Sequence, residues 1–159
     1  MIEVYLAGRM SGKTVEDAMA WRREFTSFFA ESKYVGIHNP CYLLSEVLEA
    51  KEVLNEKAPN IHHYFDGPTS YQRDLWMVDK SHVVVANLTG DDWMSIGTLF
   101  ELGYAKRAGK LIIAIAGKND YARKHLFIEN ACTLVETIDD AIVHIANIAM
   151  GAYDMGVRR

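Results

Sequence analysis

Short apolar runs alternate with amphipathic segments along the whole chain. The apolar runs predict five strands, at 2–7, 34–38, 82–88, 111–116 and a short one near Leu134. Apolar positions at helical spacing predict helices over 14–31, 43–57, 70–80, 97–108 and about 120–130, with a last helix from Asp139. This order predicts a single α/β domain over residues 1–159. We expect a doubly wound, flavodoxin- or Rossmann-like fold, with a parallel sheet of about five strands and helices on both faces.

Two segments carry more specific expectations. Thr14 is placed to cap the first helix, whose apolar face is predicted from Ala18, Trp21, Phe25 and Phe28-Phe29. Residues 58–69 hold two prolines and a glycine and predict a long loop of the functional or mobile kind.

Composition narrows the class of protein. Of 159 residues, 50% are hydrophobic and 24% charged, which is typical of a soluble globular domain. A net charge of −4 argues against binding to a nucleic acid polymer, and no apolar stretch is long enough for a membrane span. The first residues lack the basic region of a signal peptide, so we predict a cytoplasmic protein. Cys41 and Cys132 form no CxxC pair, and neither a zinc site nor a disulfide framework is expected.

Glu101 is the most informative candidate for chemistry. It lies about one turn into the helix that follows the buried strand at 82–88. Open parallel sheets bind ligands at the carboxyl ends of their strands, so we expect this helix to begin beside a ligand site. The alternative is a first-turn glutamate that is favoured by the helix dipole.

The turn after the first strand offers a competing motif. Residues 7–14, Ala-Gly-Arg-Met-Ser-Gly-Lys-Thr, match a phosphate-binding P-loop except for Ala7 at its first glycine. A kinase or NTPase using Lys13 and Thr14 is therefore an alternative. Neither of the next strands ends in the aspartate with which such enzymes usually hold Mg²⁺, which weakens this alternative.

Two further residues are ambiguous when taken singly. Asp74 follows Tyr71-Gln72-Arg73 near the start of the helix at 70–80, where an aspartate often serves only the helix dipole. Tyr5 lies within the first strand, where a tyrosine is more often a core residue with a bonded hydroxyl.

Three elements together resemble the nucleoside 2-deoxyribosyltransferase superfamily, which includes 2′-deoxynucleoside 5′-monophosphate N-hydrolases. They are Val4-Tyr5-Leu6-Ala7-Gly8, Tyr71-Gln72-Arg73-Asp74 and the segment from Gly97 to Ala105, Gly-Thr-Leu-Phe-Glu-Leu-Gly-Tyr-Ala. The resemblance covers roughly residues 2–116. It implies that Glu101 attacks C1′ of the sugar, that Asp74 helps to protonate the leaving base, and that Tyr5 orients the nucleophile. Two carboxylates with divided roles suit this bond, as in retaining glycosidases.

One departure bears on the substrate. Six residues before the nucleophile, transferases acting on free nucleosides usually carry an aspartate, whereas this chain has Ser95, as the monophosphate hydrolases do. A serine beside the helix start at Gly97 would donate a hydrogen bond to a 5′-phosphate, whereas an aspartate there would repel the phosphate. The loop residues Gly8, Arg9, Ser11 and Gly12 add amides, a hydroxyl and a cation. The alternative is that Ser95 only caps the helix.

The resemblance also implies a partner subunit. Family members often complete the site with a residue from a neighbouring subunit, and Asn130 is the candidate here, so we expect a homodimer or larger homo-oligomer. No metal or cofactor is expected; the His62-His63-Tyr64-Phe65 segment is interpreted as a lid. Asp91 and Asp92 are expected in a solvated turn, and the role of Trp93 stays open. Three hypotheses remain: an N-glycosidase or deoxyribosyltransferase, a P-loop phosphotransferase, and a non-catalytic nucleotide-binding domain.

Overall fold

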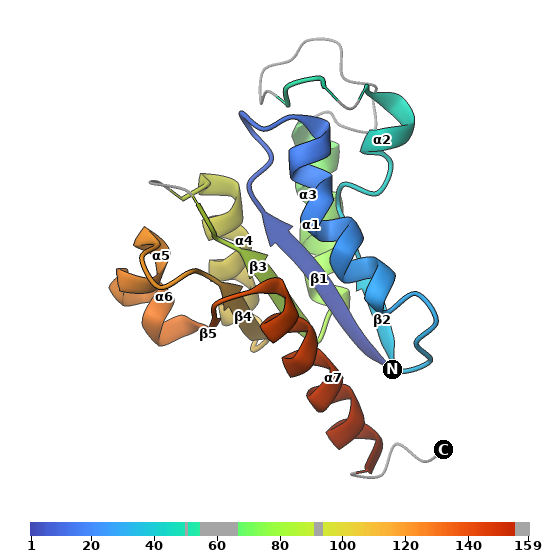
Figure 1. The fold of residues 1–159 in the computed structure, drawn as a ribbon, viewed down its shortest axis with the longest axis vertical. Helices are drawn as coiled ribbons and strands as arrows, with labels where there is room; N and C mark the ends of the chain where they lie inside the picture. Colours follow the sequence, from blue (N-terminus) through green and yellow to red (C-terminus); the bar gives the residue numbers. More distant parts are fainter. Residues whose placement is uncertain (50, 55–66, 91–93, 155–159) are drawn as a thin grey trace.

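The chain folds around a parallel β-sheet of five strands (Figure 1). The computed structural model describes residues 1–49, 51–54, 67–90 and 94–154. The strands are β1 (Ile2–Gly8), β2 (Val35–His38), β3 (Val83–Asn87), β4 (Leu111–Ile115) and β5 (Thr133–Val135). Their order across the sheet is β2-β1-β3-β4-β5, and every pair is parallel. This is the flavodoxin-like order, so the predicted α/β fold class is confirmed.

Helices cover both faces of the sheet. They are α1 (Val15–Phe28), α2 (Leu44–Val47), α3 (Gly67–Lys80), α4 (Ile96–Arg107), α5 (Tyr121–Lys124), α6 (Leu126–Ala131) and α7 (Ile138–Asp154). In Figure 1, α1 and α7 lie in front of the sheet while α3 and α4 lie behind it. Each pair of helices closes its own apolar core against one face.

Alternation along β1 decides which residues face which helices. Val4 and Leu6 join the core under α1 and α7, while Tyr5 and Ala7 join the core under α3 and α4. Successive side chains of a strand point to opposite faces, so a residue at position 5 must point toward α3 and α4. The position of Tyr5 in the strand therefore directs its side chain toward α3 and α4, the helices that carry Asp74 and Glu101.

The helix predicted over 43–57 is wrong for most of the residues that are described there. α2 spans only Leu44–Val47, and Val53 forms an antiparallel bridge with Thr14. The N–H of Gly12 donates to the Leu54 carbonyl at 2.8 Å, and the N–H of Leu54 donates to the Lys13 carbonyl at 2.8 Å. Pairing with a distant loop satisfies this backbone, and tertiary context has overridden the helical pattern.

Other boundaries also differ from prediction. α3 begins at Gly67, so residues 67–69 are helical rather than loop, and Pro68 lies in the first turn, where proline is tolerated. Phe28 is 64% exposed whereas Phe29 is buried, because only Phe29 continues the i, i+4 spacing from Phe25. The helix predicted over 120–130 is split at His125, whose backbone is extended.

Some expectations fall elsewhere. The proposed lid at 62–65 and the Asp91-Asp92-Trp93 turn lie outside the described residues. Among the helices that are described, none has the length and apolar character needed to cross a bilayer.

Candidate active site

The candidate residues meet near the carboxyl ends of the two central strands. β1 pairs with β3 so that Gly8 lies opposite Asn87. The chain leaves β1 toward α1 and leaves β3 toward α4, so the crossovers diverge between these strands. Such a switch point is where open α/β sheets bind ligands.

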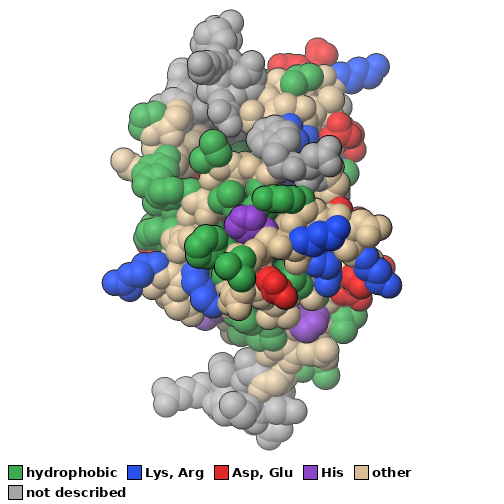
Figure 2. Space-filling view, turned by 90° about the vertical axis from the view of Figure 1, so that its left-hand side faces the viewer, with side chains coloured by type: hydrophobic (Ala, Val, Ile, Leu, Met, Phe, Trp, Pro, Cys, Tyr) green, Lys and Arg blue, Asp and Glu red, His purple; other side chains and the backbone are tan. Residues whose placement is uncertain are grey.

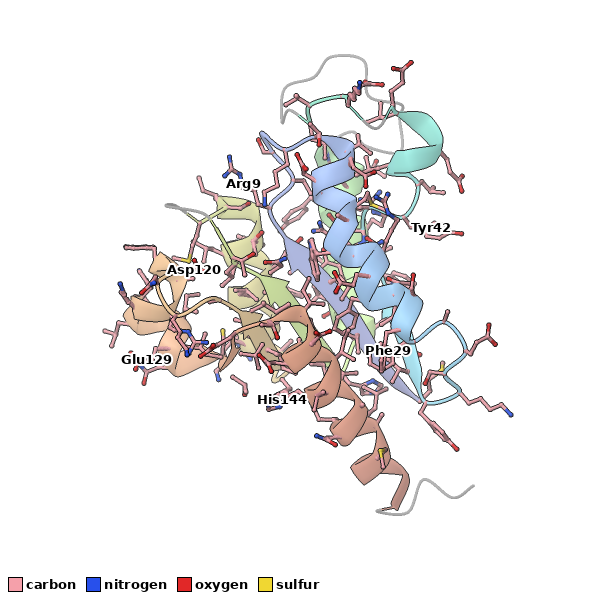
Figure 3. The ribbon with its side chains drawn as sticks, in the orientation of Figure 1. Arg9, Phe29, Tyr42, Asp120, Glu129 and His144 are labelled. Carbon is pink, nitrogen blue, oxygen red and sulfur yellow. The ribbon has the colours of Figure 1, made fainter. Side chains whose placement is uncertain are left out.

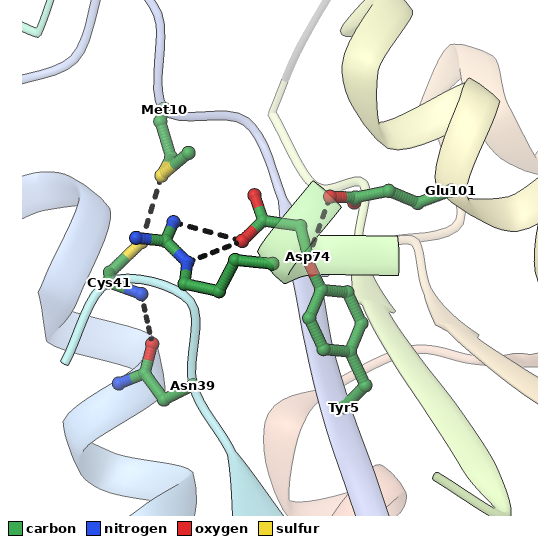
Figure 4. Close-up of polar contacts among 7 residues, drawn as sticks. Tyr5, Met10, Asn39, Cys41, Asp74 and Glu101 are labelled. Carbon is green, nitrogen blue, oxygen red and sulfur yellow. Dashed lines mark hydrogen bonds and ion pairs between the residues drawn. The ribbon is translucent and has the colours of Figure 1, made fainter. Parts of the chain in front are cut away.

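A hydrogen bond joins Tyr5 of β1 to Glu101 of α4. The Tyr5 hydroxyl donates to Oε1 of Glu101 at 2.7 Å, and the tyrosine is fully buried (Figure 4). α4 begins at Ile96 and carries no acidic residue in its first turn, so Glu101 lies in the second turn. The prediction of a first-turn position is therefore wrong, and a dipole role does not account for this carboxylate.

Asp74 lies next to this pair. It is buried in the middle of α3, and both Nε and Nη2 of Arg73 contact its Oδ1, at 3.0 Å and 2.9 Å (Figure 4). α3 has no acidic residue in its first turn, so the predicted placement of Asp74 near the helix start is also wrong. Tyr5, Asp74 and Glu101 come from three elements, and the structure brings all three together.

Burial sets the protonation of these groups. It raises the pKa of Glu101 to about 7; the Tyr5 hydrogen bond acts against this rise, and the charge of Asp74 adds to it. Burial also raises the pKa of Asp74, against the effect of Arg73. The pKa of Tyr5 lies well above its usual value, first through burial and then through the Glu101 charge, so its hydroxyl remains a donor. The cluster can thus hold a carboxylate and an exchangeable proton near neutral pH.

The loop after β1 is folded onto itself. Nε of Arg9, labelled in Figure 3, donates to the Ser11 carbonyl at 2.9 Å. Gly12 has a φ of 78°, a conformation that favours glycine. Gly8 is buried; its carbonyl accepts from Nη2 of Arg22 at 2.9 Å, and a Cβ at this position would lie 3.2 Å from Cζ2 of Trp21.

Two amides and one hydroxyl that a P-loop would use are already bonded within the protein. The N–H of Gly12 donates to Leu54, and the N–H of Lys13 donates to the Met10 carbonyl at 3.0 Å. The Thr14 hydroxyl caps α1, accepting from the Asp17 N–H at 3.1 Å and donating to the Asp17 carboxylate at 2.7 Å. A P-loop needs these amides for phosphate and this hydroxyl for Mg²⁺, so the geometry disfavours the kinase alternative.

The remaining predicted residues are more dispersed. Ser95 caps α4, its hydroxyl oxygen accepting from the Thr98 N–H at 3.4 Å, and Gly97 is exposed in the first turn. The capping role is therefore present, and the Ser95 hydroxyl still has its own proton to donate. Asn130 is exposed on α6 and donates to Leu126 of the same helix at 2.8 Å. The hydrogen bond described for Asn130 stays within α6 and makes no contact with Tyr5, Asp74 or Glu101.

Sequence reasoning missed Arg22. Its side chain is fully buried and donates to the carbonyls of Ala18 at 2.6 Å and Gly8 at 2.9 Å. The available signal was an arginine on the apolar face of α1, one turn from Ala18 and one residue from Trp21.

The described residues contain no group of three or more His, Cys, Asp or Glu that could hold a metal ion.

Comparison with known proteins identifies the family. The sequence model described as nucleoside 2-deoxyribosyltransferase matches residues 4–132. No curated protein sequence matches the chain.

Solved structures show the same fold. A conserved protein from Enterococcus faecalis V583 is 17% identical with a TM-score of 0.63, covering 92% of this chain and 98% of that one. The 2-deoxyribosyltransferase from Bacillus psychrosaccharolyticus is 14% identical with a TM-score of 0.61, covering 88% and 90%. The CMP N-glycosidase BcmB from Clostridium botulinum is 16% identical with a TM-score of 0.54, covering 91% and 98%. These likenesses support the fold, and the family match, which spans most of the chain, confirms the predicted resemblance: the chain belongs to the nucleoside 2-deoxyribosyltransferase family.

Proposed function

We propose that this enzyme cleaves the N-glycosidic bond of a 2′-deoxynucleoside, preferably as its 5′-monophosphate, through a glycosyl ester on Glu101. The observation that carries the proposal is the buried hydrogen bond between Tyr5 and Glu101 beside Asp74. A carboxylate in this setting can bond to carbon and a second carboxyl group can supply a proton.

The proposed reaction has two steps. A Glu101 oxygen bonds to C1′ while the C1′–N bond breaks, and the bond's electron pair leaves with the base, which takes a proton from Asp74. Water or another nucleobase then bonds to C1′, the ester bond breaks to return the Glu101 carboxylate, and the proton released returns to Asp74. Both steps build positive charge at C1′, which a carboxylate in a poorly hydrated setting stabilises.

Tyr5 has a positioning role in this scheme. Its hydroxyl holds Oε1, which leaves the second carboxylate oxygen to face the sugar. The same bond favours the ionised form of Glu101, and only this form is nucleophilic.

The preference for a 5′-monophosphate rests on the start of α4. This helix has Ser95 as its N-cap, and no carboxylate of its first turn offsets its positive dipole end. Arg9 lies on the loop after β1, at the same end of the sheet. A relative of similar fold is described as a CMP N-glycosidase, an enzyme of a nucleoside monophosphate.

Ser95→Asp tests this preference. The new carboxylate would repel a phosphate dianion, so KM for the monophosphate should rise much more than KM for the matching free nucleoside. Ser95→Ala is the control that removes the hydroxyl without adding charge. Equal effects of Ser95→Asp on both substrates would contradict the preference.

Base release tests the reaction itself. Purified protein is incubated with deoxynucleosides and their 5′-monophosphates, with and without an acceptor base and EDTA, and free base is measured by chromatography. We expect release that EDTA does not change and that Glu101→Gln abolishes, with Glu24→Gln, an exposed glutamate on α1, as the matched control. A slow substrate with fluorine at C2′ should add the mass of its sugar to the wild type and to Glu24→Gln, but not to Glu101→Gln. ATP turnover that requires Mg²⁺, or tight binding without turnover, would contradict the proposal.

We also propose that the protein works as a homo-oligomer with sites completed by Asn130 of a neighbouring copy. Support comes from apolar side chains left exposed on two surfaces: Tyr71, Trp76 and Phe100 on α3 and α4, and Leu126 and Phe127 on α6. Figure 2 shows hydrophobic side chains gathered on the side of the molecule where α5 and α6 lie.

Mixing variants tests the shared site. Light scattering should give at least twice the 18.0 kDa chain mass. Glu101→Ala and Asn130→Ala proteins should each be impaired, and mixing them under exchange should restore activity, because a mixed site can hold both native residues. A monomer, or no recovery on mixing, would contradict the shared site.

A further inference from the structure

Arg22 is a buried cation behind the candidate site. It is the largest fully buried side chain of the described residues, with 0% exposure. No carboxylate in the described part of the chain forms an ion pair with it. Its guanidinium carbon lies 4.8 Å from the centre of the Trp21 ring, and its Nε is buried without a hydrogen-bond partner there. A charge buried without a direct partner is destabilising unless nearby anions offset it.

The guanidinium is attached to the end of β1. Nη2 donates to the Gly8 carbonyl at 2.9 Å, and Nη1 donates to the Ala18 carbonyl at 2.6 Å. A Cβ at position 8 would lie 3.3 Å from Nη2 and 3.2 Å from Cζ2 of Trp21, so glycine gives the guanidinium room to approach. Arg22 thereby ties helix α1 to Gly8, the last residue of β1.

Nearby acids experience the charge of Arg22. The charge of Arg22 favours the ionised forms of Glu101, Asp74 and Tyr5, and that of the buried Cys41 thiol. In each case it acts against burial, which is the larger influence and raises the pKa. Tyr5 faces Glu101 from β1, Asp74 faces it from α3 together with the paired Arg73, and Arg22 acts from α1. Arg73 is already bonded to Asp74, whereas within the described residues the hydrogen bonds of Arg22 go to two neutral carbonyls.

We propose that Arg22 is a positioning residue: buried behind Tyr5, Asp74 and Glu101, it holds the end of β1 in place and serves as the internal counter-charge of the site. Direct contact with the substrate is not part of this role, since the side chain is fully buried. This proposal rests on the proposed role of Glu101.

The pH dependence of kcat/KM separates this role from a merely structural one. In Arg22→Met, the acid limb should move upward from about pH 7, with a several-fold loss of rate at pH 6 that is largely recovered at pH 9. Arg22→Lys keeps the charge and should keep the limb close to its original place. Arg23→Met, an exposed arginine on the same helix, is the matched control and should leave the profile unchanged.

Nuclear magnetic resonance gives a reading that needs neither turnover nor a variant of Arg22. The Arg22 Nε–H resonance of the wild type should shift with a midpoint near pH 7, and this shift should be absent in Glu101→Gln. An Nε–H that does not sense Glu101, or an acid limb in Arg22→Met that stays in place, would overturn the counter-charge role. Absence of base release by the wild type would instead contradict the proposed function.

Discussion

At the residue scale, opposing influences act on the pKa of Glu101. Burial favours the protonated form of Glu101, while the Tyr5 hydroxyl and the Arg22 charge favour the ionised form. The resulting pKa of about 7 lies well above the 4.5 that is usual for glutamate. Glu101 can therefore change protonation state within the physiological range, and its environment controls how much nucleophile is present.

The rate should follow this ionisation. We expect kcat/KM to rise with pH through about 7, because the carboxylate forms in the free enzyme over that range. Glu101→Gln should lower kcat by roughly 1,000-fold or more, as removal of a nucleophile does elsewhere. A profile that is flat between pH 5 and 8 would place the nucleophile at another residue.

Tyr5→Phe keeps the buried ring and removes the hydroxyl. A hydrogen bond to a charged group contributes about 1.5–3 kcal/mol, so kcat/KM should fall about 10- to 100-fold. The acid limb should also move upward, because the Tyr5 bond lowers the pKa of Glu101. Steady-state kinetics across pH would detect both effects, and an unchanged limb would mean that the hydroxyl does not act on Glu101.

Glu101 should also make stability depend on pH. Its pKa is raised on folding, so the folded state binds the proton more tightly than the unfolded state does. The resulting contribution to the free energy of unfolding is complete below about pH 4.5 and is lost as pH rises through about 7. Glu101→Gln stays neutral and should be more stable than the wild type at pH 8, by up to about 3 kcal/mol. Urea unfolding at pH 5 and pH 8 would measure this; an equal difference at both values would contradict it.

Elements differed in how well their sequences predicted them. The three inner strands β1, β3 and β4 were predicted closely because each is an apolar run that is largely buried on both faces, and the Tyr5, Asp74 and Glu101 motifs occur on or beside them. Residues 52–54 were not, because their conformation comes from pairing with residues 12–15, a contact that no local pattern encodes. Arg22 was missed for a related reason: arginine is usually exposed, and only the folded end of β1 supplies the carbonyls that accept its hydrogen bonds.

Two glycine substitutions should have opposite effects on their elements. Gly12→Ala places a side chain at a φ of 78° and a Cβ 3.0 Å from Arg9 Nη2, and should destabilise the protein by roughly 1–2 kcal/mol. Gly103→Ala lies within α4, where a Cβ meets no atom within 4 Å, and should stabilise by about 0.5–1 kcal/mol. Thermal unfolding compares them directly, and the same sign for both would contradict the loop conformation.

The two cores share a single sheet at the scale of the whole molecule. Val4 and Leu6 pack on one face of β1 while Tyr5 and Ala7 pack on the other, so neither core can open without disturbing the strand common to both. The site depends on the same strand, since Tyr5 and Gly8 belong to it.

Unfolding should accordingly be a single event. In a urea titration, loss of helical circular dichroism, change in tryptophan fluorescence and loss of base release should share one midpoint. Activity that disappears at a clearly lower urea concentration would show that the site opens before the sheet does.

The bond between Tyr5 and Glu101 joins residues 96 positions apart. A chain emerging from the ribosome holds its first strand long before the partner helix has been synthesised, and closing so wide a loop is slow compared with forming a local turn. Newly made protein should hence remain inert toward nucleotides until the central strands are in register, so the onset of catalysis would time the final stage of folding.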